Sequence, residues 1–270
     1  MEEAVFVKES EERLFIKAQG HITAQLCPEL KARAFSRLEA EPPLKAVYVD
    51  FEGCEYMDSN TTPTLPRFVV LEGLDGAGTT TQLKLIGQAL EKADIPHWIT
   101  FEPTDLPSGR LVRRILKGEV EARPETLARL FSADRHEHLY GKGGIVERLR
   151  RGELVVCDRY VFSSLAYQGL SCGPALPLLL NGAFPLPELL IYFSIPAAVS
   201  MGRVEGRENR EIFETKPIQE RVSSLYESVI SNYESRGLSV LRVDASLPIE
   251  EVSARILHRL AELIGIKALH

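Results

Sequence analysis

The 270-residue chain has little cysteine, and its cysteines form no pattern. The four residues Cys27, Cys54, Cys157 and Cys172 lie far apart, with no C-x-x-C pair. This spacing argues against a disulfide framework and against a zinc knot, so we expect reduced thiols.

Signals for export, for a membrane span and for general nucleic-acid binding are also missing. The N-terminus MEEAVFVKES is acidic where a signal peptide is basic, and prolines interrupt the most apolar stretch, LPLLLNGAFPLPELLIYF. The net charge of -6 disfavours general affinity for a nucleic-acid backbone. With 44% hydrophobic residues the chain can bury a sizeable core. We therefore expect a cytoplasmic globular protein that binds neither membrane nor nucleic acid.

From about Arg67 onward, apolar strand patterns alternate with amphipathic helix patterns. Strands are predicted at RFVVLEG, HWITFE, ELVVCD, ELLIYFSI and GLSVLRVD, with helices at 79–93, about 123–151 and 249–265. This alternation is typical of a parallel sheet with helices on both faces. The sequence therefore predicts a three-layer α/β domain over residues 67–270.

Residues 1–62 are organised differently. AVFVKES and RLFIKAQG are predicted to pair as strands, a helix is predicted at 25–41 and a further strand at KAVYVDFEG. Residues 63–66 then read as a linker, because prolines and threonines disfavour regular structure there. Below about 70 residues a single core seldom supplies more than a few kcal/mol, so this small α/β appendage is expected to lean on the larger domain or on a partner protein.

The stretch GLDGAGTTTQ at 73–82 has the glycine spacing of a phosphate-binding loop. It follows a predicted strand and opens a predicted helix, so backbone N–H groups and the helix dipole can face a phosphate. Thr80 occupies the Ser/Thr position whose hydroxyl reaches nucleotide-bound Mg²⁺, whereas Thr79 stands where such loops have a lysine. The predicted ATP and phosphate contacts in this loop are Gly73, Gly76, Ala77, Gly78, Thr79, Thr80 and Thr81.

Four motifs in this order, EGLDGAG, EPTD, LFSADRHEHL and CDRYVFSSLAYQG, resemble the thymidylate kinase family. Its members transfer the γ-phosphate of ATP to dTMP. The resemblance runs from about Arg67 to the end of the chain, and it implies a P-loop NTPase fold of the nucleoside monophosphate kinase type. It further implies ATP and dTMP as substrates, Mg²⁺ as the cofactor and, by analogy, a homodimer.

The resemblance also implies roles for individual residues. Asp75 would hold the dTMP sugar hydroxyl and orient the acceptor, while Asp158 and Arg159 would serve the metal and phosphate region, with Thr80 as the other metal ligand. Phe131 would stack on the thymine and Arg135 would hydrogen-bond its edge. The full set of implied dTMP contacts is Glu102, Phe131, Arg135, Ser163, Tyr167 and Gln168, with Ser164 nearby.

Taken singly, several of these residues have simpler interpretations. Phe131 is also compatible with a core position, Arg135 with an exposed helix position, and Asp158 with Arg159 as a surface ion pair. The ordered combination of four motifs favours the site over these alternatives.

A second cation is missing where the family has an arginine before Glu-Pro, because TFEPTD places Phe101 there. Replacement charge is available in SMGRVEGRENREIFE, the region of the family's lid. There Arg203, Arg207 and Arg210 fall at i, i+4 and i+7, which puts them on one face of a continuous helix. The alternative is a solvated charged face, because glutamates are interspersed.

The segment VDFEGCEYMDSNT resembles the central strand and phosphorylatable turn of STAS domains, although the second half of that fold is absent. Ser59 aligns with the serine that such proteins phosphorylate, but the glycine and leucine expected after it are missing. This favours a turn residue over a regulatory site.

Three functional hypotheses remain open. The favoured one is an active dTMP kinase with Asp75, Arg159 and Arg207 as catalytic residues. The second is a nucleotide-binding, catalytically weak or inactive homologue that acts through interaction, as the loss of the loop lysine and of the arginine at Phe101 would suggest. The third is a kinase for another nucleotide or a nucleoside, which the combination of Phe131, Arg135 and Gln168 disfavours.

Overall fold

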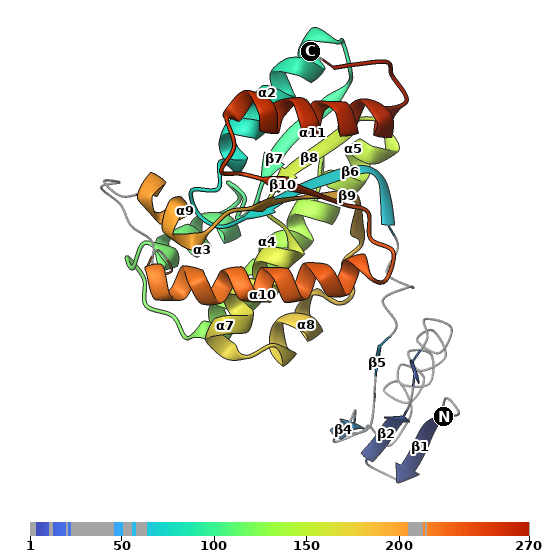
Figure 1. Cartoon of the computed structure of the whole chain (residues 1–270). Coiled ribbons are helices and arrows are strands. Elements are labelled where there is room, and N and C mark those ends of the chain that lie inside the picture. The colour runs from blue at the N-terminus through green and yellow to red at the C-terminus, as the bar shows by residue number, and fades with distance from the viewer. Residues whose placement is uncertain are drawn as a thin grey trace. The chain divides into compact units, whose positions relative to one another are not determined.

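The structure is a computed structural model that describes residues 64–204, Phe213 and residues 215–269, together with five strands of the N-terminal part (Figure 1). The chain divides into two compact units, Met1–Thr61 and Thr62–His270.

The described strands of the first unit form two small sheets. Strand β1 (Ala4–Ser10) pairs antiparallel with β2 (Arg13–Gln19), and β2 pairs parallel with β4 (Ala46–Asp50). Strands β3 (His21–Ile22) and β5 (Tyr56–Met57) form a separate parallel ladder. The strands predicted at AVFVKES, RLFIKAQG and KAVYVDFEG are thus found. The helix predicted at 25–41 and Ser59 lie outside the described residues.

The second unit is built on a five-stranded sheet in the order β10-β9-β6-β8-β7, in which every neighbouring pair is parallel. The register pairs Leu71 with Asp158 and Gly73 with Phe193, so the carboxyl ends of the three central strands lie together. In open α/β sheets this is the edge at which ligands bind. The strands are β6 (Thr64–Gly73), β7 (His97–Phe101), β8 (Leu154–Asp158), β9 (Leu186–Ser194) and β10 (Val240–Asp244).

Strand β6 begins earlier than the sequence pattern suggested. Residues 64–66, expected to belong to a linker, form its start, and Thr64 and Leu65 pair with Leu186 and Pro187. The register then shifts between Leu65 and Val69. Pairing with the first residues of β9 therefore overrides the local preference of this proline-containing segment.

Helices cover both faces of the sheet, which confirms the three-layer prediction. In Figure 1, α2 (Thr79–Lys92) and α11 (Ile249–Ile264) lie on one face, and α4 (Pro124–Tyr140) and α10 (Lys216–Glu234) lie on the other. The remaining helical segments are α3 (Pro107–Leu116), α5 (Ile145–Arg150), α6 (Val161–Ser163), the π-helical turn η2 (Ser164–Gln168), α7 (Gly169–Cys172), α8 (Ala175–Asn181) and α9 (Ala197–Val204). In the described part of the chain, no helix combines the length and apolarity that a membrane crossing requires.

The helical region predicted at about 123–151 is interrupted. Helix α4 ends at Tyr140 and α5 starts at Ile145, with a glycine-rich turn between them. Gly143 has a positive φ of 73°, and a side chain at Gly141 would collide with the Glu137 carbonyl. The GKGG sequence therefore ends one helix and allows the next to start in a new direction.

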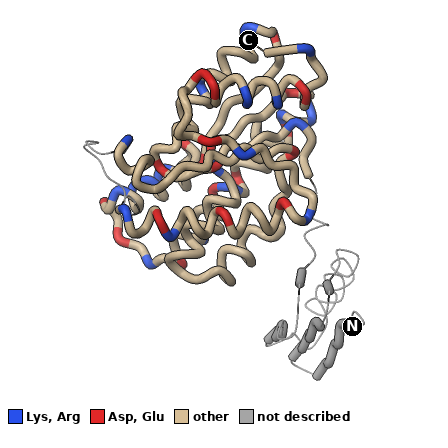
Figure 2. The backbone as a smooth tube through the Cα atoms, viewed as in Figure 1, with Lys and Arg blue, Asp and Glu red and all other residues tan. Residues whose placement is uncertain are grey.

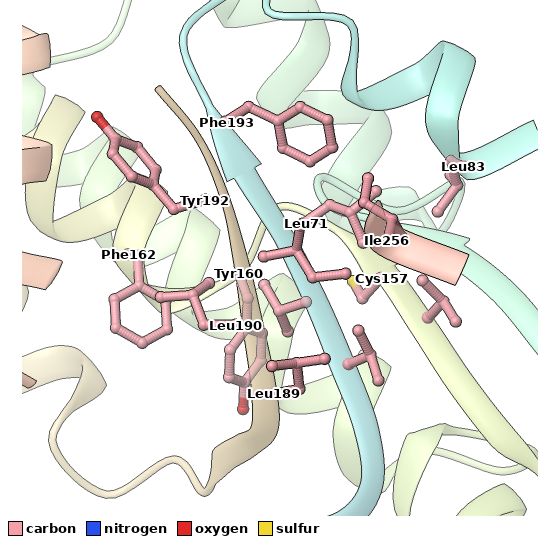
Figure 3. Packing of buried hydrophobic residues seen from close by; sticks show 14 of the residues in the cluster. Leu71, Leu83, Cys157, Tyr160, Phe162, Leu189, Leu190, Tyr192, Phe193 and Ile256 are labelled. Atoms are coloured by element: carbon pink, nitrogen blue, oxygen red, sulfur yellow. The ribbon is translucent and has the colours of Figure 1, made fainter. Parts of the chain in front are cut away.

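The core fixes the sheet against both helix layers. Figure 3 shows Leu71, Cys157 and Leu190 of the central strands packed between side chains from opposite faces, such as Ile256 and Phe162. All five side chains are fully buried. Dense packing of this kind locks strand register, and thereby fixes the positions of the polar residues at the strand ends.

Candidate active site

The glycine-rich loop leaves the carboxyl end of β6 and enters α2 at Thr79. A side chain at Gly73 would press against the Phe193 Cβ at 3.0 Å, and Gly76 and Gly78 have positive φ values of 84° and 94°. Glycine is thus required both for the close approach to β9 and for the turn. The loop borders a cavity of about 560 Å³, the loop cavity. Of the predicted phosphate contacts, Gly76, Ala77, Gly78, Thr79, Thr80, Thr81 and Arg203 line it.

Two threonine hydroxyls meet a carboxylate at the end of β8. Thr79 Oγ1 and Thr80 Oγ1 each donate to Asp158 Oδ2, at 3.2 Å. Asp158 is 9% exposed, and burial raises the pKa of its carboxyl group. Its second oxygen, Oδ1, is buried with no hydrogen-bond partner within the protein. A buried carboxylate oxygen without a partner, beside a threonine hydroxyl, is a donor set that suits a hard cation such as Mg²⁺.

A second cavity, the acceptor cavity, adjoins the first. All six residues predicted to contact dTMP line it, and Asp75, Glu102, Pro103 and Arg159 line both cavities. Phe131 is half-buried and also packs against the apolar cluster of α3 and α4. The two cavities therefore meet at one carboxylate-rich corner that holds Arg159.

Arg135 is a buried cation, only 1% exposed, so its interpretation as an exposed helix residue is wrong. Its guanidinium lies 2.7 Å from Glu102 Oε2 and donates to Ser164 Oγ and to the Asn181 side-chain oxygen. The rings of Tyr160 and Phe184 lie 5.0 and 5.8 Å from its central carbon. These contacts fix the orientation of the guanidinium in the wall of the acceptor cavity.

A second layer of side chains holds Glu102. His138 Nδ1 lies 3.1 Å from Glu102 Oε1, and its other ring nitrogen lies 2.8 Å from Thr100 Oγ1. His138 belongs to the LFSADRHEHL motif, so the sequence pointed to this segment. The contact between His138 and Glu102 is visible only in the structure. Asn181 lies in the apolar segment ALPLLLN, which carries no sequence signal of such a contact.

Asp75 and Arg159 form an ion pair at 2.5 Å, with side chains 20% and 22% exposed. Asp75 Oδ2 also accepts from Tyr167 Oη at 3.0 Å and from Gln219 Nε2 at 2.9 Å. Burial, and then the Asp75 charge, raise the pKa of Tyr167, which keeps its hydroxyl a donor. Arg159 thus pairs with Asp75. The simpler interpretation, a surface ion pair between Asp158 and Arg159, is wrong.

Glu72, just before the loop, connects several parts of the site. It accepts from the backbone N–H of Tyr160 and Ser163 at 2.8 and 3.1 Å, from Ser163 Oγ at 2.6 Å and from Tyr226 Oη of α10 at 2.9 Å. Glu72 is fully buried, and burial raises its pKa from 4.5 to about 7. Sequence reasoning missed Glu72, Gln219 and Tyr226, although Glu72 lies within the EGLDGAG motif.

The raised pKa of Glu72 predicts a pH-dependent loss of stability. As pH rises from 4.5 towards 7, Glu72 ionises in the unfolded chain before it ionises in the folded protein. Folding therefore loses free energy over this window, on the order of 3 kcal/mol. Glutamine does not ionise. It fits the same contacts because the hydroxyls of Ser163 and Tyr226 can accept hydrogen bonds from its amide. Between pH 4.5 and 8, Glu72→Gln is expected to gain about 3 kcal/mol in unfolding free energy relative to the unmodified protein.

Urea unfolding across this pH range measures that difference. The matched control is Glu121→Gln on the exposed surface, which is expected to track the unmodified protein at every pH. If the difference in unfolding free energy between Glu72→Gln and the unmodified protein stays constant with pH, the pKa of Glu72 in the folded protein is ordinary.

The loop after β7, which has Phe101 where the family has an arginine, is held by Arg113 and Asp134. Phe101 is 40% exposed, and the Arg113 guanidinium lies 5.1 Å from its ring centroid. Arg113 also pairs with Asp105 at 2.7 Å and donates to the carbonyls of Pro103 and Thr104. Asp134 of α4 accepts from the N–H and hydroxyl of Thr104 at 2.7 and 2.6 Å. Arg113 thus braces the loop and lines neither cavity.

Gly109→Ala is expected to disturb this loop. A Cβ at Gly109 would overlap the Thr104 backbone, so the loop must shift. We expect a loss of about 1–3 kcal/mol in stability, typical of overpacking, and weaker dTMP binding. Chemical unfolding and dTMP titration measure the two effects. Gly169→Ala is the matched control, since a Cβ there meets nothing within 4 Å; equal behaviour of the two variants would contradict the expectation.

Arg203, at the end of α9, lines the loop cavity, whereas Arg207 and Arg210 lie outside the described residues. In the view of Figure 2, acidic and basic positions are interspersed over the larger unit.

A glycine-rich loop between a parallel strand and a helix, with an acceptor cavity at the same sheet edge, defines a P-loop kinase of small molecules. The family model described as "Thymidylate kinase" matches residues 71–256. A protein named "Putative thymidylate kinase" from Treponema pallidum (strain Nichols) is 41% identical over 206 residues, covering 75% of this chain and 99% of that protein. A second protein of that name, from Aeropyrum pernix, is 39% identical over 207 residues, covering 74% of this chain and 98% of its own. A "Thymidylate kinase" from Leptospira interrogans serogroup Icterohaemorrhagiae serovar copenhageni is 37% identical over 169 residues, covering 61% and 82%. The chain belongs to the thymidylate kinase family.

Proposed function

We propose that this protein transfers the γ-phosphate of Mg-ATP to dTMP, giving ADP and dTDP for pyrimidine deoxynucleotide biosynthesis. The observation that carries the proposal is the junction of two cavities. The loop cavity suits a nucleotide triphosphate, the acceptor cavity gathers every predicted dTMP contact, and Asp75 and Arg159 line both. The names of the relatives support the same reaction.

At the donor end, the loop N–H groups and the start of α2 would hold the ATP phosphates. Thr80 Oγ1 and the Asp158 carboxylate, which accepts from that hydroxyl at 3.2 Å, would hold Mg²⁺. When bound, Mg²⁺ would neutralise charge on the phosphates. The described cations on this cavity are Arg159 and Arg203, and we propose that Arg207 and Arg210 of the lid add to them.

At the acceptor end, Phe131 would stack on thymine while Arg135, held by Glu102 and Asn181, donates to its edge. Asp75 would bind the sugar hydroxyl, and Tyr167 and Gln168 would close the pocket. Arg159 would lie between the acceptor phosphate and the γ-phosphate. Catalysis would consist of alignment and charge stabilisation, which dominate phosphoryl transfer.

We further propose that the protein is a cytoplasmic homodimer. The exposed apolar side chains Leu178 and Leu179 of α8 and Tyr140 of α4 support a contact face, because α4 and α8 pack together. The division into a STAS-like part at 1–62 and a kinase domain from 67 to 270 stays a prediction, as does a protein partner for the first part, whereas residues 64–66 of the expected linker belong to β6.

The test is ADP formation by the purified protein from Mg-ATP with dTMP, UMP or thymidine. We expect turnover with dTMP at roughly 1–100 s⁻¹, the usual range of kinases, and little with the other two. Arg207→Ala is expected to lower the rate by orders of magnitude, with Arg150→Ala on the exposed end of α5 as the control. Binding of ATP and dTMP without ADP formation would instead support a nucleotide-binding homologue that does not catalyse.

A further inference from the structure

The hydroxyl protons of Thr79 and Thr80 are both engaged in hydrogen bonds to Asp158. A carboxylate can only accept, so both threonines donate to Asp158 Oδ2. Each hydroxyl carries one proton, and what remains is its lone pairs. A phosphate oxygen also offers lone pairs. In this arrangement Thr79, which stands in the place of a lysine ammonium, would present an acceptor rather than a donor to a nucleotide phosphate bound at the loop.

Among the described residues that line the loop cavity, Asp158 is the carboxylate without an ion pair, because Asp75 pairs with Arg159 and Glu102 pairs with Arg135. The described lining of this cavity contains three carboxylates, Asp75, Glu102 and Asp158, and two guanidiniums, Arg159 and Arg203. Arg159 is held by Asp75 at 2.5 Å, and Asp158 Oδ1 is buried without a partner. The phosphates of ATP would add negative charge beside Asp158, and one Mg²⁺ at Thr80 would leave the Thr79 hydroxyl still facing an anion.

We propose that Thr79 Oγ1 and Asp158 Oδ1, together with the ATP phosphates, bind a monovalent cation such as K⁺ in place of the missing ammonium. The inference rests on the proposed function, because it needs ATP in the loop cavity. Hydroxyl, carboxylate and phosphate oxygens are suitable ligands for a hard cation. Over residues 64–204 and 215–269, no three His, Cys, Asp or Glu side chains group to hold a metal ion. The cation would therefore share its ligands with the nucleotide and bind with it.

The test is calorimetric binding of Mg-AMPPNP, without dTMP, in KCl or in tetramethylammonium chloride at equal ionic strength. The unmodified protein is expected to bind roughly tenfold or more tightly in KCl, the effect of one contact to a charged group. Thr79→Lys carries its own ammonium, so its affinity is expected to be high and equal in both salts. Thr79→Val keeps the shape without the hydroxyl and is expected to bind weakly in both. Thr126→Lys, exposed on α4, is the matched control and should keep the potassium effect.

Three results would overturn the proposal. Equal affinity of the unmodified protein in both salts would mean that no monovalent cation is bound, and it would leave the kinase reaction untouched, since ADP formation is measured separately. A full potassium effect in Thr79→Lys would place the cation elsewhere. No AMPPNP binding in either salt would overturn this inference and the proposed function together.

Discussion

Arg159→Ala is expected to lower kcat for dTDP formation by about three orders of magnitude or more, the scale of an arginine contact on transferring phosphate. Among the described residues, Arg159 is the one cation that lines the loop cavity as well as the part of the acceptor cavity beside Asp75. The loop lysine and the arginine before Glu-Pro are both replaced, by Thr79 and Phe101, so fewer other charges can compensate. Single-turnover measurements with saturating Mg-ATP and dTMP report the chemical step directly.

Two further variants separate charge from structure. Arg159→Lys keeps the charge but loses the planar fork, so it is expected to retain only part of the activity. Asp75→Asn keeps a partner for Arg159 and tests the acceptor contact. Arg150→Ala, exposed on α5, serves as the control. A fall in kcat below tenfold for Arg159→Ala, with folding intact by circular dichroism, would assign the charge stabilisation to the lid arginines instead.

The sheet could be predicted because its strands are continuous apolar runs followed by turn residues. β6 from Phe68 onward, β8 and most of β9 are buried on both faces, and strands of this kind contain few polar residues. The loop was predicted for a related reason, since its glycines, the strand before it and the helix after it are all local in sequence.

The contacts that complete the site are not local. Asn181 reaches Arg135 across 46 residues, and Gln219 reaches Asp75 across 144. No periodicity encodes such pairs, because they depend on how α8 packs against α4 and how α10 packs on the sheet. The same holds for Thr79, whose hydrogen bond to Asp158 appears only once β8 lies beside β6. The sequence identified the missing lysine, while the structure shows what the hydroxyl does instead.

The buried pair of Arg135 and Glu102 leads to the second large effect. The side chains are 1% and 3% exposed and lie 2.7 Å apart. Removing one partner leaves an uncompensated buried charge, so Arg135→Met and Glu102→Leu are each expected to cost about 3–5 kcal/mol of unfolding free energy. Each is also expected to weaken dTMP binding, whereas ATP binding at the loop should be retained.

The double variant distinguishes a buried charge pair from two independent residues. With both charges removed, its loss of stability is expected to be smaller than the sum of the single losses, because neither charge remains unpaired. Arg151→Met, from the exposed pair with Glu147, is the control and is expected to cost under about 1 kcal/mol. Urea unfolding gives the stabilities and dTMP titration gives the binding. Strictly additive losses would mean that the two side chains stabilise the fold separately. Recovery of stability without recovery of dTMP binding would show that this pair is maintained for nucleotide recognition, at a site where apolar residues would serve the fold as well.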